Sequence, residues 1–218
     1  MALIFDLDGT LLDSLQLHKK GLEYGFNIVL GKGTIPYGFL SRRIRYPAET
    51  LFELVSKKIG RNLTATEIKR IMAEKQRLLT YANIKKVRFY KGVCALIKLL
   101  MRNKIKFCIA TAMNTKELRK FKRILKLNDL SKIIVNPDSP KHAKPDPYIL
   151  NKAIRLLKVN KTKSVYIGDS PYDAVTAKRA EIGFIGVFNR EELNKYEFYS
   201  SIEALLRMVQ KNLFRFED

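Results

Sequence analysis

Short apolar runs alternate along this chain with longer amphipathic stretches. The runs have the length of buried strands, and the stretches between them repeat apolar residues with the period of a helix packed on one side. Strands are predicted at Ala2–Phe5, Lys106–Ala110, Lys132–Val135, Ser164–Ile167 and Phe184–Val187. Helices are predicted near Val93–Asn103, Lys116–Leu125, Pro147–Leu157 and Tyr172–Ala180. The alternation predicts an α/β fold, in which a parallel sheet has helices on both of its faces.

Capping signals predict where several helices begin and end. A capping box headed by Thr64 begins a helix that runs to about Tyr81, and Ser200 with Glu203 begins the final helix. Gly183 is predicted to end the helix before it in a left-handed conformation. With these boundaries the strands and helices resemble a Rossmann-like core.

The segment 15–86 interrupts the strand and helix alternation. It has helical patterns, among them one near Ala48–Ile59, but no convincing buried strand. We therefore predict an α/β core of residues 1–14 and 87–218, with a small α-helical cap domain at 15–86. Ligands of open α/β sheets bind at the carboxyl ends of the strands, so the cap is expected to act as a lid over that edge.

The chain has 218 residues and a formal net charge of +21, which raises the possibility of a nucleic-acid partner. The basic residues, however, are spread along the whole chain, without a basic tail or interleaved aromatic residues. We favour a lysine-rich surface that attracts anionic substrates over a nucleic-acid-binding surface. A monomer or a homodimer is equally compatible with this composition.

Several features favour a cytoplasmic protein without a membrane partner. No apolar run approaches the roughly 20 residues that span a bilayer, and no basic region precedes the first apolar stretch. Cys94 and Cys108 both lie among apolar residues, so both are predicted to be buried and reduced.

The strongest chemical signal is Asp6-Leu7-Asp8-Gly9-Thr10, directly after the first predicted strand. Two carboxylates spaced two residues apart point to one side of the pleat and repel each other. A divalent cation would offset that repulsion, and one carboxylate could then attack an anionic substrate while the other moves protons. A strand followed by an Asp-Gly turn is the purely structural interpretation of the same residues.

Three further motifs follow predicted strands or lead into helices. Thr111 and the backbone beside it could hold phosphate oxygens, although such residues are also common helix caps. Lys144, directly before the two prolines of the next motif (Pro145 and Pro147), could neutralise a phosphate, or it could belong to an ordinary loop. Asp169 offers a hard oxygen ligand for Mg²⁺, whereas Asp173 also fits the third position of a helix that Ser170 caps.

These four motifs, in this order, resemble those of the haloacid-dehalogenase-like hydrolase superfamily. The match is closest to the phosphoglycolate-phosphatase-like branch, in which a helical cap is inserted after the first motif. Thr111 is the least specific match, because the residues after it are only loosely like the family's segment.

The resemblance implies a phosphatase with a defined set of site residues. Asp6 would be the nucleophile that forms an aspartyl-phosphate, and Asp8 would protonate the leaving oxygen and then activate water. Mg²⁺ would be held by Asp6, the Asp8 backbone carbonyl and Asp169, with Asp173 supporting the site. The transferring phosphoryl group would be bound by three positions: Thr111, the Ala112 N–H and Lys144.

Other functions remain open on the sequence. A phosphomutase would use the same motifs, whereas a dehalogenase does not ordinarily carry a carboxylate at the position of Asp8. Phospho-accepting receiver domains lack the insertion after the first strand, and a non-catalytic phosphate- or nucleic-acid-binding protein would show no turnover. The expected substrate is a small phosphorylated metabolite, with 2-phosphoglycolate as the candidate. Arg42, Arg43 and Arg45 could contact a second anionic group of it, although solvated surface charges are the favoured interpretation.

Overall fold

The computed structural model describes residues 1–36, 38–188 and 193–214. The chain divides into two compact units, of which the first comprises residues 1–13 and 88–218 and the second residues 14–87. Each unit is described on its own below. Among the described residues, no helix combines the length and the apolar character that crossing a membrane requires.

The first unit is built on a parallel sheet of six strands in the described chain, in the order β3-β2-β1-β4-β5-β6. The strands are β1 (Ala2–Phe5), β2 (Lys106–Ala110), β3 (Ile134–Val135), β4 (Ser164–Gly168), β5 (Gly183–Val187) and β6 (Phe198–Tyr199). Phe5, at the end of β1, is in register with Ile109 of β2 and Ile167 of β4. The residues that follow these three strands therefore emerge at one edge of the sheet.

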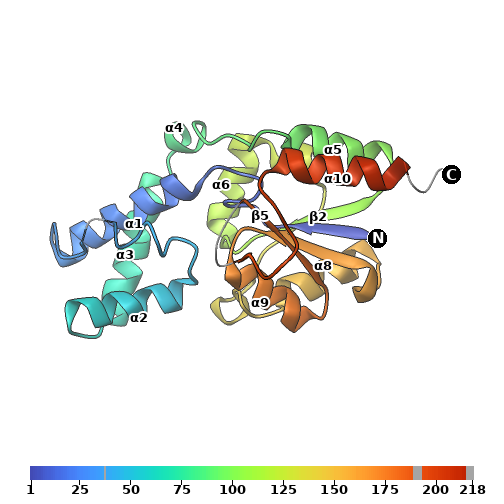
Figure 1. Ribbon diagram of the computed structural model, residues 1–218. Coiled ribbons are helices and arrows are strands. Elements are labelled where there is room, and N and C mark those ends of the chain that lie inside the picture. The colour runs from blue at the N-terminus through green and yellow to red at the C-terminus, as the bar shows by residue number, and fades with distance from the viewer. Residues whose placement is uncertain (37, 189–192, 215–218) are drawn as a thin grey trace. The chain divides into compact units, whose positions relative to one another are not determined.

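Helices cover both faces of this sheet. The helices of the unit are α5 (Val93–Arg102), α6 (Thr115–Leu125), α7 (Leu127–Leu130), α8 (Tyr148–Leu157), α9 (Pro171–Ala180) and α10 (Ile202–Phe214). Figure 1 shows α8 and α9 on one face and α5 with α10 on the other. Ile4 packs with Cys108 and Tyr166 in a cluster against α8 and α9, and Leu3 and Phe5, which alternate with it, are buried too. Burial on both faces explains why the central strands are continuous apolar runs.

The regular elements of the second unit's described part are all helices, namely α1 (Leu15–Leu30), α2 (Ala48–Ile59), α3 (Ala65–Leu78) and α4 (Tyr81–Ile84), and turns connect α1 to α2. Helices α1 and α3 pack so closely at Gly25 that a Cβ there would lie 2.5 Å from the Ile71 carbonyl oxygen. Phe26 and Phe52 meet edge to face in its apolar core, 5.9 Å between ring centroids. That this unit acts as a lid stays a prediction.

Two of the predicted helix boundaries are wrong by one or two residues. Gly183 is the first residue of β5, and the left-handed position that ends the preceding helix is Glu181, with φ of 60°. The last helix is capped by Ser201, whose hydroxyl accepts the Ala204 N–H at 3.1 Å, rather than by Ser200. Ser200 and Ser201 have the same capping chemistry, so the sequence does not distinguish them, whereas Glu181 adopts a left-handed conformation that glycine usually takes.

Other differences concern short elements and one side chain. Helix α3 has the predicted capping box at Thr64 but ends at Leu78, before the separate short helix α4. Strand β3 covers only the last two of its four predicted residues, and β6 was not predicted. The prediction that both cysteines are buried is wrong for Cys94, which is exposed on α5, whereas Cys108 is buried and both thiols are free.

Candidate active site

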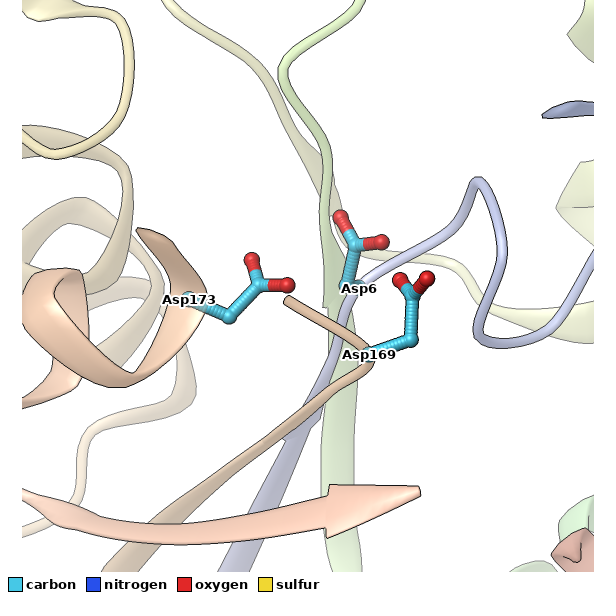
Figure 2. A group of neighbouring side chains, drawn as sticks. All are labelled: Asp6, Asp169 and Asp173. Carbon is cyan, nitrogen blue, oxygen red and sulfur yellow. The ribbon is translucent and has the colours of Figure 1, made fainter. Parts of the chain in front are cut away.

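Three aspartates from separate parts of the sequence converge at the carboxyl edge of the sheet. Asp6 directly follows β1, Asp169 follows β4, and Asp173 lies in the first turn of α9. The Asp6 N–H donates to the Ile167 carbonyl at 2.8 Å, so the sheet itself fixes the start of this loop beside β4. Figure 2 shows the three carboxyl groups gathered around one space. This juxtaposition was predicted from the sequence, and the geometry agrees with it.

The acidic cluster formed by Asp6, Asp169 and Asp173 is almost closed to solvent. Their exposed fractions are 5%, 2% and 1%, and one oxygen from each lies within 4.8 Å of the others. Burial raises the pKa of Asp6 well above its usual value, and the charges of Asp173 and Asp169 raise it further, while Lys144 lowers it. Three buried carboxylates at such distances need positive charge or protons to coexist.

Lys144 supplies positive charge to this cluster. Its ammonium group donates to Asp6 Oδ1 at 2.5 Å and to Asp173 Oδ1 at 2.7 Å, and the residue is only 8% exposed. Burial acts to lower the pKa of Lys144, but the charges of Asp173 and Asp6 outweigh burial and raise it above the usual value. The lysine is therefore held as a cation between the two acidic motifs, as its position in the sequence suggested.

Asp173 serves both the helix and the cluster. Its Oδ2 accepts from the Ser170 N–H at 3.1 Å and from the Ser170 hydroxyl at 2.6 Å, and the Ser170 hydroxyl accepts the Asp173 N–H at 3.2 Å. This reciprocal pair is the capping box predicted for α9. Gly168 is required beside it, since a Cβ there would lie 2.6 Å from Asp173 Cβ. The other oxygen of Asp173 faces Lys144.

Tyr166 of β4 is a member of the site that the sequence analysis did not identify. Its hydroxyl is buried, 3.1 Å from Asp173 Oδ1 and 3.2 Å from the Ala110 carbonyl, and Lys144 Nζ lies 5.2 Å from the centre of its ring. Burial and the charges of Asp173 and Asp6 raise the pKa of this phenol, so it is a neutral donor. A buried tyrosine needs a partner for its hydroxyl, and this was the signal available in the sequence.

Gly9 and Thr10 shape the loop after β1. Thr10 Oγ1 donates to Asp169 Oδ1 at 3.2 Å, which ties the first acidic motif to the last. Gly9 has φ of +82°, and a Cβ on it would lie 2.5 Å from Asp169 Oδ2. Both the positive φ and the close approach require glycine here. The Gly-Thr pair therefore has a definite role beyond making a turn.

Asp8 differs from the other acids of the site. It is partly exposed, and its carboxylate is not a member of the three-aspartate cluster. Its negative charge nevertheless contributes to raising the pKa of Asp6, so the two side chains interact. A carboxylate beside the buried cluster but open to solvent can exchange protons with a substrate and with water.

Thr111 and Ala112 follow β2 at the same edge of the sheet. Thr111 is fully buried, its N–H donates to the Val135 carbonyl at 2.9 Å, and its hydroxyl accepts the Met113 N–H at 3.2 Å. The Thr111 N–H is therefore used within the fold and not open to an anion. Among the described residues, the N–H of the exposed Ala112 has no acceptor, and its use in phosphate binding stays a prediction.

The loop that carries Lys144 is held by a second set of contacts. Asp138 accepts from the Tyr148 hydroxyl and lies 2.5 Å from His142 Nδ1, and the His142 and Tyr148 rings stack at 4.1 Å. The hydrogen bonds from Tyr148 and His142 lower the pKa of Asp138 to about 2. On the other side of the loop, Arg179 donates to the Pro145 carbonyl at 3.2 Å.

The cap arginines lie in the second unit, between α1 and α2. Arg43 donates to the Phe39 carbonyl at 3.0 Å, and its guanidinium lies 4.1 Å from the centre of the Phe39 ring. Arg42 is exposed and Arg45 is partly buried. Local contacts thus account for the position of Arg43, and a role in substrate binding stays a prediction for all three.

The acidic cluster fits a small hard cation. Mg²⁺ takes oxygen ligands and is commonly held by one or two carboxylates together with water and substrate phosphate. Asp6 and Asp169 offer such oxygens, and Asp173 is already engaged with Lys144 and Ser170. The donor set therefore suits Mg²⁺ held mainly by the first two residues, with Asp173 in support.

Comparisons with known proteins agree with this geometry. The family described as "Haloacid dehalogenase-like hydrolase" matches residues 3–187. Pyrophosphatase PpaX from Listeria welshimeri is 28% identical over 192 residues, which cover 85% of this chain and 82% of that protein. Phosphoglycolate phosphatase from Rhodobacter capsulatus is 29% identical over 188 residues, which cover 84% and 82%. The crystal structure of a hydrolase from Pseudomonas syringae has the same fold, with a TM-score of 0.82 at 23% identity over 96% of this chain and 98% of that one.

Proposed function

This chain belongs to the haloacid dehalogenase-like hydrolase family, and from that membership and the site geometry we propose that it is a Mg²⁺-dependent phosphatase. It would hydrolyse a small phosphate ester in two steps, through a phosphoryl group carried on Asp6. The contacts that Lys144 makes with Asp6 and Asp173 are the observation that carries the proposal, because they join three distant motifs in one buried site.

Asp6 and Asp8 would divide the chemistry between them. Asp6 attacks phosphorus with a carboxylate oxygen, the bond from phosphorus to the leaving oxygen breaks, and an acyl phosphate forms. Asp8, which is open to solvent, gives its proton to the leaving oxygen and then takes one from the water that attacks the acyl phosphate. Inorganic phosphate is released and both carboxylates return to their starting state.

The other residues hold charge in place. Phosphoryl transfer depends mainly on positioning and on neutralising the equatorial oxygens. Lys144, the Ala112 N–H and the Thr111 hydroxyl would bind those oxygens, and Asp173 with Tyr166 keeps Lys144 directed at Asp6. When bound by Asp6, the Asp8 carbonyl and Asp169, Mg²⁺ supplies the further positive charge that lets a carboxylate approach an anion.

The substrate class is narrowed by the named relatives. The Rhodobacter protein is a phosphoglycolate phosphatase, and the Listeria protein is a pyrophosphatase. We propose a small phosphomonoester such as 2-phosphoglycolate, with inorganic pyrophosphate as the second candidate. The leaving oxygen belongs to an alcohol in the first case and to phosphate in the second, and the site residues would act alike. Since Cys94 is an exposed free thiol, we also propose a reducing, cytoplasmic location.

Release of inorganic phosphate from a substrate panel tests the proposal. The panel contains 2-phosphoglycolate, inorganic pyrophosphate and p-nitrophenyl phosphate, each with Mg²⁺ and with a chelator. We expect release that requires Mg²⁺, with one panel member preferred. No release from any member would refute the phosphatase. In a separate incubation with a sugar phosphate, transfer of phosphate within the sugar without release would show a phosphomutase.

Matched aspartate variants assign the roles. Asp6→Asn should abolish turnover while the circular dichroism spectrum stays unchanged, and Asp8→Asn should lower it by about 10²–10⁴-fold. Asp129→Asn, at an exposed position on α7, is the control and should keep full activity. Activity retained in Asp6→Asn would remove Asp6 as the nucleophile.

A further inference from the structure

A basic groove lies between α6, α7 and β3, and none of the residues of the acidic cluster line it. Its volume is about 500 Å³, and it is lined by Thr115, Leu118, Arg119, Lys122, Arg123, Asn128, Ile134 and Asn136. We call it the α6 groove. Pockets that bind small organic ligands have volumes of roughly 300–1,000 Å³, and the α6 groove falls within this range.

Three cations gather on the side of α6 that lines the groove. Arg119 lies three residues before Lys122 and four before Arg123, so its side chain is a neighbour of both on the helix surface. Within the described chain none of them forms an ion pair, and none of the residues lining the groove is acidic.

Cations at other surface positions do pair with acids. Lys19 contacts Glu23 at 3.5 Å, and Lys161 contacts Glu181 at 3.1 Å. Like charges three or four residues apart on a helix repel each other and destabilise it. The cluster on α6 therefore costs helix stability, and a bound anion would offset that cost.

The remaining lining residues are not those of a site for phosphate alone. Leu118 and Ile134 are the apolar residues of the lining; Leu118 is almost fully buried and Ile134 is partly exposed, so the apolar wall is formed chiefly by Ile134. Asn128 and Asn136 bring amide groups to the same groove, and Asn136 Nδ2 donates to Thr115 Oγ1 at 3.1 Å. An apolar wall with amides beside it suits a heterocyclic base, which is flat and carries donors and acceptors on its rim.

We propose that the α6 groove is a second, non-catalytic binding site for a nucleoside diphosphate or triphosphate. The phosphates would lie against Arg119, Lys122 and Arg123, which provide bidentate and point-charge contacts for adjacent phosphate groups. The base would lie chiefly against Ile134. This site is independent of the proposed phosphatase activity, because it uses none of the residues of the acidic cluster.

Binding of fluorescently labelled ADP to the whole protein tests this proposal. The titration is made with a chelator present, so that the acidic cluster carries no metal and repels phosphate. We expect saturable binding that unlabelled ADP and inorganic triphosphate displace and that adenosine alone does not. ADP should also raise the midpoint of thermal unfolding, since a ligand that binds only the folded state stabilises it.

Two variants with the same change in charge make the test specific. The first combines Arg119→Gln, Lys122→Gln and Arg123→Gln, and should weaken ADP binding by at least about tenfold. The control removes three exposed cations elsewhere, with Lys98→Gln, Arg102→Gln and Arg155→Gln, and should bind ADP as the unmodified protein does.

Several results would overturn the proposal. These are the absence of ADP binding, equal weakening in the two variants, and displacement by adenosine as effective as that by ADP. Tighter binding of a single-stranded oligonucleotide than of ADP, with a steep loss of affinity in salt, would show a nucleic-acid surface instead. Because all titrations are made without metal, none of these results depends on whether the protein is a phosphatase.

Discussion

Replacing Lys144 by methionine should make the stability of the first unit depend strongly on pH. The substitution keeps a long unbranched side chain but removes the ammonium group that donates to Asp6 and Asp173. Both carboxylates would then stay buried beside each other and beside Asp169 without that charge.

The magnitude follows from the burial of the partners. Removing one member of a buried ion pair costs about 3–5 kcal/mol of unfolding free energy when the other member stays charged. The pKa of Asp6 is already raised by burial, and Lys144 opposes that rise, so its loss should raise this pKa further. Each unit of additional rise corresponds to about 1.4 kcal/mol.

The sign of the pH effect follows from proton binding. Between the pKa of Asp6 in the unfolded chain, about 3.9, and its raised value in the folded state, the folded protein binds more protons. Stability therefore falls as pH rises through this window. Lys144→Met should have a lower unfolding free energy than the unmodified protein, and this difference should be largest near pH 8 and clearly smaller near pH 5.

Urea unfolding at pH 5 and at pH 8, with a chelator present, measures this deficit. Because the chain has two units, the probe should report on the first unit alone. Cys108 provides it, since this thiol is buried in β2, and burial raises its pKa to about 12, so that it reacts only after the sheet opens. Added Mg²⁺ should restore more stability to Lys144→Met than to the unmodified protein, because a bound cation takes over the missing charge.

Lys141→Met is the matched control, in the same loop but at an exposed position, and should change stability little at either pH. The reasoning fails if Lys144→Met shows the same deficit at pH 5 and pH 8, or shows none. An equal deficit at both pH values would mean that the substitution destabilises the protein through lost packing and not through uncompensated charge.

Three further outcomes follow from the site and the core. Tyr166→Phe removes a buried hydrogen bond to the Asp173 carboxylate, so we expect a loss of about 1.5–3 kcal/mol in urea unfolding and a lower kcat with little change in KM. Gly9→Ala forces a Cβ to 2.5 Å from a carboxylate oxygen of the cluster at φ of +82°, and should cost at least about 1–2 kcal/mol and weaken Mg²⁺ binding, measured by thermal unfolding with and without Mg²⁺. A thiol reagent near pH 8 should modify Cys94 alone in the native protein and Cys108 as well in denaturant; rapid native labelling of both would contradict the burial.

The central strands of the sheet could be predicted from the sequence, whereas the two short outermost strands could not be predicted accurately. The predicted boundaries of β1 and β2 agree with the structure, because strands covered on both faces are continuous apolar runs with sharp polar ends. Strands β3 and β6 have two residues each, and their existence depends on neighbours that pair with them. A pattern of two residues carries no period, so β3 was predicted only as part of a longer run, Lys132–Val135, and β6 was not predicted.

The positions of the site residues were predictable, but their partners were not. Parallel strands bring their carboxyl ends to one edge, and this rule alone places Asp6 and Asp169 together. The contact between Lys144 and Asp6 spans 138 residues of sequence, and no local pattern specifies it. The same holds for the Tyr166 hydroxyl, whose role is visible only when the burial of the phenol and its acceptors are known.

Asp173 shows why a structural and a functional explanation of one residue need not exclude each other. On the sequence, Asp173 fits the capping box of α9, and the resemblance also implies that it supports a metal site. The structure divides its carboxylate between two tasks, with Oδ2 bonded to Ser170 and Oδ1 bonded to Lys144. The cap fixes the direction of the carboxylate, and that direction in turn fixes the lysine beside Asp6. The first turn of helix α9 therefore helps to position Lys144, through the carboxylate of Asp173. The geometry of the proposed site thus depends on the stability of that one turn.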